Sequence, residues 1–128
     1  MAHPNADLIR KGFEAFAAGD MAALDALIAD DAKWHASGRT PVSGDFEGKE
    51  AIFGFFARIA KESDTFEQAL HAVLADDEHA VALVKTTAAR GGKELKYDTV
   101  FVFHVTEGKL TETWFTPVDH AAVEAFWA

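Results

Sequence analysis

The run Phe101-Val102-Phe103-His104-Val105-Thr106-Glu107-Gly108-Lys109-Leu110 carries the strongest fold signal in this chain of 128 residues. Aromatic and β-branched residues, which favour strands, fill its first half. Glu107-Gly108 supplies a turn, and the strand pattern resumes at Lys109 and stops before Pro117. The run therefore predicts a hairpin of two long strands.

Helical patterns precede this hairpin, and further strand patterns lie between. Apolar residues such as Leu8, Ile9 and Phe13 recur at helical spacing before Gly19, and Gly91-Gly92 is a good hairpin turn. We expect helices over 4–18, 21–28, 49–61 and 118–127, a turn-rich segment over 37–48, and strands over 32–36, 65–75, 80–90, 93–106 and 109–116. Because the helices come first and no βαβ rhythm follows, the predicted fold class is α+β, in a single domain over residues 1–128.

Composition narrows the classes of function. The formal net charge of -9 disfavours both nucleic acid and an anionic membrane surface as partners. The chain has no cysteine, and no apolar run is long enough to cross a bilayer. The first residues lack a secretion-signal pattern, so we expect a cytoplasmic protein. Eleven Phe and three Trp against one Tyr exceed the needs of a small core, and they predict an apolar cavity.

Two further stretches carry a resemblance to a known family. Ala29-Asp30-Asp31-Ala32-Lys33-Trp34-His35 follows the predicted helix pair, and Ala36-Ser37-Gly38-Arg39-Thr40-Pro41-Val42-Ser43-Gly44 continues it. With the late hairpin and the closing Phe126-Trp127, this order resembles an uncharacterised bacterial branch of the SnoaL-like, nuclear-transport-factor-2-like superfamily, which also contains ketosteroid isomerase. The resemblance implies a cystatin-like cone, in which a strongly curved mixed or antiparallel sheet packs on the N-terminal helices around an internal pocket.

The resemblance also implies which positions carry chemistry in relatives. The donor, base and acid of the isomerase mechanism would fall at Gly12, Ala36 and Phe101. The acid–base Asp and the supporting His of the polyketide cyclases would fall at Phe115 and Phe101. None of these side chains can transfer a proton. A steroid isomerase of that mechanism is therefore not expected.

Strand alternation sorts the side chains of the late hairpin. If Phe101 faces the inside of the cone, so do Tyr97, Thr99 and Phe103, whereas the residues that alternate with them face outward. With the family alignment, this predicts a ligand-binding wall made of Phe16, Trp34, Phe56, Phe101, Phe103, Thr113 and Phe115. The outward face is a common dimerisation surface among relatives, and we expect a homodimer through Val100, Val102, His104 and Trp114.

Three polar residues are candidate catalytic groups, each with a plainer alternative. His35 titrates nearest neutral pH, but alternation turns it outward, where it would anchor the loop through a backbone hydrogen bond. Arg39 could hold a carboxylate or enolate oxygen, or could form a surface ion pair with Asp45 or Glu47. Tyr97 could hydrogen-bond a ligand carbonyl, or could be a core aromatic with its hydroxyl at the rim.

Three functions stay open on this sequence, and none of them calls for a metal or a cofactor. Its six histidines are dispersed without the i, i+4 spacing of a zinc helix, and no nucleotide-binding motif is present. The resemblance to the family favours a cofactor-independent enzyme of isomerase, cyclase or hydrolase type. Such an enzyme would act on a small hydrophobic carbonyl compound by acid–base chemistry. Apolar walls with few polar anchors favour a non-catalytic protein that binds such a ligand. A dimerisation module with a vestigial pocket is the third interpretation.

Overall fold

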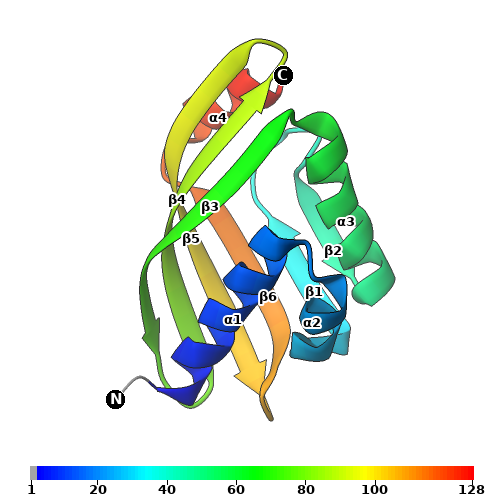
Figure 1. Ribbon diagram of the computed structural model, residues 1–128, viewed down its shortest axis with the longest axis vertical. Helices are drawn as coiled ribbons and strands as arrows, with labels where there is room; N and C mark the ends of the chain where they lie inside the picture. Colours follow the sequence, from blue (N-terminus) through cyan, green and yellow to red (C-terminus); the bar gives the residue numbers. More distant parts are fainter. Residues whose placement is uncertain (1–2) are drawn as a thin grey trace.

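The computed structural model describes residues 3–128 (Figure 1). Its helices and strands follow the expected order, except that a short strand, Gly44–Glu47, lies within the segment 37–48 that the sequence predicts to be turn-rich. The elements are α1 (Pro4–Ala18), α2 (Met21–Leu27), β1 (Ile28–Ala36), β2 (Gly44–Glu47), α3 (Lys49–Glu62), β3 (Thr65–Ala75), β4 (His79–Arg90), β5 (Lys93–Thr106), β6 (Lys109–Pro117) and α4 (His120–Trp127). The strands form one sheet in the order β2-β1-β6-β5-β4-β3. Neighbours are antiparallel except β1 and β6, which run parallel, so the predicted α+β class with a mixed sheet is confirmed.

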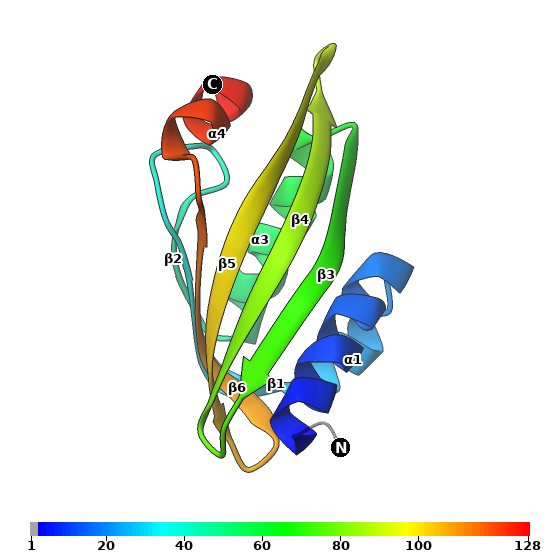
Figure 2. The same ribbon diagram turned by 90° about the vertical axis from the view of Figure 1, so that its left-hand side faces the viewer.

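The helices cover one face of the sheet and one of its ends. Helix α1 packs on β3 and β4, and α3 packs on β1, β2 and β3. Figure 2 shows α1 beside β3 and α3 behind β4 and β5. Helix α4 packs instead against β5 and β6, at the end of the sheet where the chain terminates (Figures 1 and 2). This arrangement leaves the opposite face of the sheet without a covering helix among the described residues.

Local sequence signals explain several boundaries. Gly19 ends α1 in the left-handed region, with φ 68°, which costs a glycine little. Asp20 then caps α2, because its carboxylate accepts a hydrogen bond from the backbone nitrogen of Ala23 at 3.1 Å. Gly91 and Gly92 both have positive φ, as the predicted tight turn between β4 and β5 requires.

Strand β1 begins at Ile28, four residues before the predicted strand. Ile28 pairs with Leu110 of β6, and the register then shifts before Lys33 pairs with Glu112. The segment between these pairs includes the exposed Asp30, which bonds to Lys49 at 3.0 Å instead of facing the core. An irregular stretch of this kind breaks the alternation of apolar and polar residues. The sequence therefore predicts only the regular second half of the strand.

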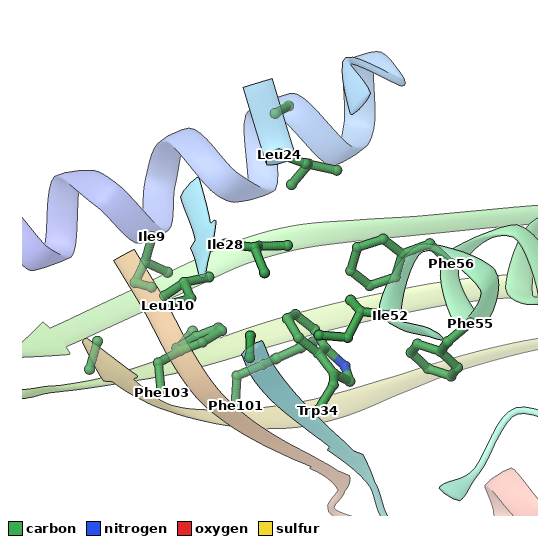
Figure 3. Close-up of a cluster of buried hydrophobic side chains, with 14 of the residues drawn as sticks. Ile9, Leu24, Ile28, Trp34, Ile52, Phe55, Phe56, Phe101, Phe103 and Leu110 are labelled. Atoms are coloured by element: carbon green, nitrogen blue, oxygen red, sulfur yellow. The ribbon is translucent and has the colours of Figure 1, made fainter. Parts of the chain in front are cut away.

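The core lies between the concave face of the sheet and helices α1 to α3. Figure 3 shows Ile9 and Leu24 on the helix side of this cluster, with Phe101 and Phe103 of β5 on the sheet side. A second, smaller cluster forms where α4 meets the sheet, around Trp127, which is 1% exposed. Packing of aromatic rings therefore supplies both the main core and the attachment of the last helix.

Replacing Phe55 by Ala should lower the free energy of unfolding by about 3–5 kcal/mol, because it leaves a cavity where a large ring packs. The ring is 2% exposed and stacks on Phe46 with ring centres 4.7 Å apart. Leu74→Ala is the control, since that side chain is 62% exposed and its loss should change the stability by no more than about 0.5 kcal/mol. Urea denaturation measures both, and equal losses for the two variants would contradict this account of the core.

Candidate functional site

The division of the sheet into an inner and an outer face follows the predicted alternation. Phe101 and Phe103 of β5 and Trp34 of β1 are buried in the core beneath the helices. Val102 and His35, which alternate with them, are only partly buried. The expected inward and outward directions of these side chains are therefore confirmed.

The inner face encloses a cavity of about 60 Å³ against α1, α2 and α3. Its walls include six of the seven residues predicted to bind a ligand: Phe16, Trp34, Phe56, Phe101, Phe103 and Phe115. Phe101 stacks on Phe115 with ring centres 5.1 Å apart, so the rings form a continuous apolar wall. Of the described residues around this cavity, none has a titratable side chain. The cavity can therefore hold an apolar group but offers no side chain for acid–base catalysis.

Trp34 brings an unused hydrogen-bond donor to these walls. Its indole nitrogen is buried and has no hydrogen-bond partner within residues 3–128. The ring packs edge-on against Phe56 with centres 5.2 Å apart, and Figure 3 shows the nitrogen on the side that faces Phe55. A buried polar group without a partner costs about 1–3 kcal/mol. An acceptor atom supplied by a ligand would remove that cost.

Thr113, the seventh predicted wall residue, is paired with Trp34 in the register of β1 and β6. It is 1% exposed, and its hydroxyl is also buried without a partner in the described part of the chain. It is not among the residues that line the cavity. The structure thus places two unsatisfied polar groups on adjacent strands, with Trp34 alone of the two at the cavity wall.

Tyr97 lies in a second, more polar cavity. This cavity has a volume of about 40 Å³, and its walls include Tyr97, Thr99, His120 and Glu124. Burial raises the pKa of Tyr97 to about 12, so the phenol stays neutral and can donate a hydrogen bond at physiological pH. Tyr97 shares the inner face with Phe101, but it lies four residues earlier on β5, where it packs against the cluster that contains Trp127 of α4. The structure therefore separates it from the apolar walls that the sequence groups with it.

Gln68 of β3 is a site residue that the sequence reasoning missed. Its side chain is half-buried and lines both cavities. A signal for it exists in the sequence, because alternation from the apolar Phe66 to Leu70 puts Gln68 on the same face. Burial is incomplete along much of β3, so a polar residue at an inner position of this strand does not by itself mark a site.

His35 faces outward, away from both cavities, between two carboxylates. Its Nδ1 lies 2.6 Å from Asp45 of β2, and its Nε2 lies 2.7 Å from Glu112 of β6. Hydrogen bonding to Asp45 and then to Glu112 raises the pKa of His35. Because both ring nitrogens face acceptors, the imidazolium form, which donates from both, fits this site. The ring also stacks on Trp114 with centres 5.3 Å apart. The contacts differ from the backbone hydrogen bond expected of a loop anchor.

Arg39 is exposed in the segment between β1 and β2. It forms no ion pair with the described residues, and Asp45, one of its two expected partners, bonds to His35 instead. The residues that line the two cavities do not include it. The three candidate catalytic residues therefore lie apart, with His35 on the outer face, Arg39 on the surface and Tyr97 in the second cavity. Their catalytic roles stay predictions.

Comparison with known proteins fits this architecture. The sequence pattern of the SnoaL-like domain matches residues 9–113. The chain belongs to the SnoaL-like domain family. Uncharacterized proteins of Mycobacterium bovis and Mycobacterium tuberculosis are 32% identical to this SnoaL-like chain over 124 residues, which is 95% of each protein. The resemblance found in the sequence is thereby confirmed.

Solved structures agree with the assignment. Bal32a, from a soil-derived mobile gene cassette, is 36% identical, with a TM-score of 0.93 over 98% of this chain and 97% of Bal32a. A putative SnoaL-like polyketide cyclase from Jannaschia has a TM-score of 0.82 at 14% identity, over 98% of this chain and 92% of its own. TerC, co-crystallized with polyporic acid, has a TM-score of 0.87 at 18% identity, over 97% and 98%. At these low identities the last two show the shared fold alone.

Two other kinds of feature are absent from residues 3–128. No helix there is both long enough and apolar enough to span a bilayer. The same residues contain no cluster of three His, Asp or Glu side chains arranged to hold a metal ion.

Replacing Asp45 by Asn or Glu112 by Gln should lower the pKa of His35, because each change removes a carboxylate that favours the imidazolium. NMR titration of the ring measures this directly, with Asp31→Asn, an exposed change on the same strand, as the control. A pKa of His35 that does not fall in either variant, or falls equally in the control, would contradict the assigned contacts.

The same contacts predict how stability depends on pH. Since the pKa of His35 is raised in the folded state, its contribution is complete below the unfolded value of about 6.5 and is lost as the pH rises through the folded value. The stability difference between the wild type and His35→Asn should therefore shrink as the pH rises. A difference that grows with pH would show the opposite sign of linkage.

Proposed function

We propose that this SnoaL-like domain binds a small hydrophobic compound bearing a carbonyl group inside its apolar cavity. The observation that supports the proposal is the unpaired, buried indole N–H of Trp34 in a wall that is otherwise almost entirely apolar. A carbonyl oxygen is the acceptor that such a donor would satisfy, and the aromatic rings around it suit an apolar ring.

The cavity is small for a ring compound, so binding would require a wall to move. Its volume is about 60 Å³, whereas an engineered cavity that binds benzene measures roughly 150 Å³. Phe16, Phe56, Ile59 and Phe66 also line an outer groove of about 640 Å³. Rotation of Phe16 toward this groove would enlarge the cavity, because its ring belongs to both.

Binding without catalysis is the function that the cavity favours. No titratable side chain is present among its described walls, whereas proton transfer needs one within hydrogen-bonding reach. TerC, a protein of the same fold, was co-crystallized with polyporic acid, which is consistent with a fold that accepts organic ligands.

A cofactor-independent isomerase, cyclase or hydrolase is the second candidate. The specific observation in its favour is that Tyr97, His120 and Glu124 line the second cavity, which adjoins the first. A ligand reaching both cavities would meet these titratable groups. Chemical conversion of a bound carbonyl compound that is abolished by Tyr97→Phe would favour the enzyme over the binding protein.

A homodimer through the outer face of the sheet completes the proposal. Val100, Val102 and Trp114 are partly exposed there and line a shallow groove with His35. A standard interface buries about 800 Å² of each partner, and a face with these side chains is unusually apolar for a monomer.

Acetophenone and α-methylstyrene test the carbonyl contact, because they have nearly the same shape and differ in C=O against C=CH2. Acetophenone should bind about threefold to tenfold more tightly, the effect of one net hydrogen bond. Trp34→Phe should abolish this preference while α-methylstyrene still binds. Protein-observed NMR titration measures the affinities, with Trp114→Phe on the outer face as the control. Equal binding by the wild type, or a preference that survives Trp34→Phe, would rule out the contact.

Sedimentation tests the dimer. The wild type should sediment at twice the chain mass of 13.9 kDa at micromolar concentration. Trp114→Glu should sediment as the monomer, because a charge in the centre of the interface is costly to desolvate. Ala22→Glu, an exposed change on α2, is the matched control and should leave the dimer intact. A wild type of 13.9 kDa would refute the interface.

A further inference from the structure

Gln68 stands at the junction of the two inner cavities. Four residues line both: Ile59, Phe66, Gln68 and Phe115. Three of them are apolar, so the carboxamide of Gln68 is the polar group that the two spaces share. A ligand that extends from the apolar cavity toward the second one must pass this side chain.

The hydrogen-bonding capacity of the Gln68 side chain is unused among the described residues. Within residues 3–128 its side chain makes no hydrogen bond, although a carboxamide offers two donors and one acceptor. Nearby polar groups of the inner face behave differently. Thr86, which pairs with Gln68 in the register of β3 and β4, bonds to Thr99 at 3.0 Å. The strand therefore presents a free carboxamide where its polar neighbour is satisfied.

The charges around the two cavities restrict the group that Gln68 can recognise. No Lys or Arg is among the described residues that line either space, and the second cavity includes the carboxylate of Glu124. The phenol of Tyr97 is neutral there, and the chain carries a net charge of -9. A ligand carboxylate would lose its hydration beside Glu124 and would meet neither Lys nor Arg in these walls, whereas a neutral hydroxyl could both donate and accept.

We infer that Gln68 determines ligand specificity by hydrogen-bonding a neutral hydroxyl at the end of the ligand opposite its carbonyl. The inference rests on the proposed carbonyl-binding function and narrows its ligand class to hydroxylated ring ketones and aldehydes. The ring lies among the phenylalanines of the first cavity, the carbonyl meets Trp34, and the hydroxyl points past Gln68 toward the second cavity. The site excludes the corresponding carboxylates.

Three para-substituted compounds test this assignment. 4′-Hydroxyacetophenone should bind roughly threefold to tenfold more tightly than acetophenone, and 4-acetylbenzoate should bind more weakly than either. Gln68→Met keeps the length of the side chain but removes its hydrogen bonds. This variant should lose the preference for the hydroxyl, so that it binds 4′-hydroxyacetophenone and acetophenone with affinities within twofold of each other.

Glu67→Met is the matched control, because Glu67 is the adjacent, exposed residue of β3 and faces the other side of the sheet. It should keep the wild-type order of affinities, and an amide spectrum of each variant confirms its fold. A hydroxyl preference that is absent from the wild type, or that survives in Gln68→Met, would overturn the role of Gln68.

The outcome can be told apart from failure of the proposed function. Suppose that acetophenone still binds more tightly than α-methylstyrene through Trp34. The absence of a preference for 4′-hydroxyacetophenone then refutes only the role of Gln68. If the wild type shows neither the carbonyl preference nor the hydroxyl preference, both the carbonyl site and the role of Gln68 are refuted.

Discussion

The two-residue alternation of side chains along β1, β5 and β6 is the constraint on which the rest of the structure depends. Trp34, Phe101 and Phe115 take the inner positions of these strands, and His35 and Trp114 take the outer ones. A slip of one residue would exchange the two faces and bury the imidazole of His35 and the carboxylate of Glu112 in the aromatic core. The alternation therefore keeps charge out of the cavity and aromatic rings within it.

The outer and inner faces of the sheet differ in the charges that their side chains carry. On the outer face, two carboxylates stabilise the imidazolium of His35, and the three groups join β2, β1 and β6. On the inner face, the described walls of the first cavity carry no charged side chain, and the indole N–H of Trp34 has no partner among the described residues. Unsatisfied polar atoms are uncommon in folded proteins and call for an explanation. A ligand acceptor at Trp34 would supply one for the indole, whereas Thr113, the other buried residue with an unpaired polar atom in the described part of the chain, does not line the cavity.

Much of this arrangement follows from local sequence, and the remainder depends on contacts between distant residues. The hairpin around Gly108, the cap at Gly19 and the inward direction of Phe101 are local consequences of residue type and spacing. The bonds from His35 to Asp45 and Glu112 depend on the pairing of β1 with β2 and, in parallel, with β6, which no local pattern encodes. The sequence groups Tyr97 with Phe101, because alternation predicts which face of the sheet a residue lies on but not how far it lies from α4. Gln68 was missed for a related reason, since only the packed sheet shows which positions along β3 reach a cavity.

The resonances of the three indole N–H groups test the central claim most directly. Trp34, Trp114 and Trp127 give separate signals in a 15N-labelled sample, and acetophenone can be added until binding saturates. The account predicts that the Trp34 proton moves to lower field as it donates to the carbonyl, while the Trp114 signal on the outer face stays in place. Saturation with no movement at Trp34, or with the main shift at Trp114, would contradict an internal carbonyl site.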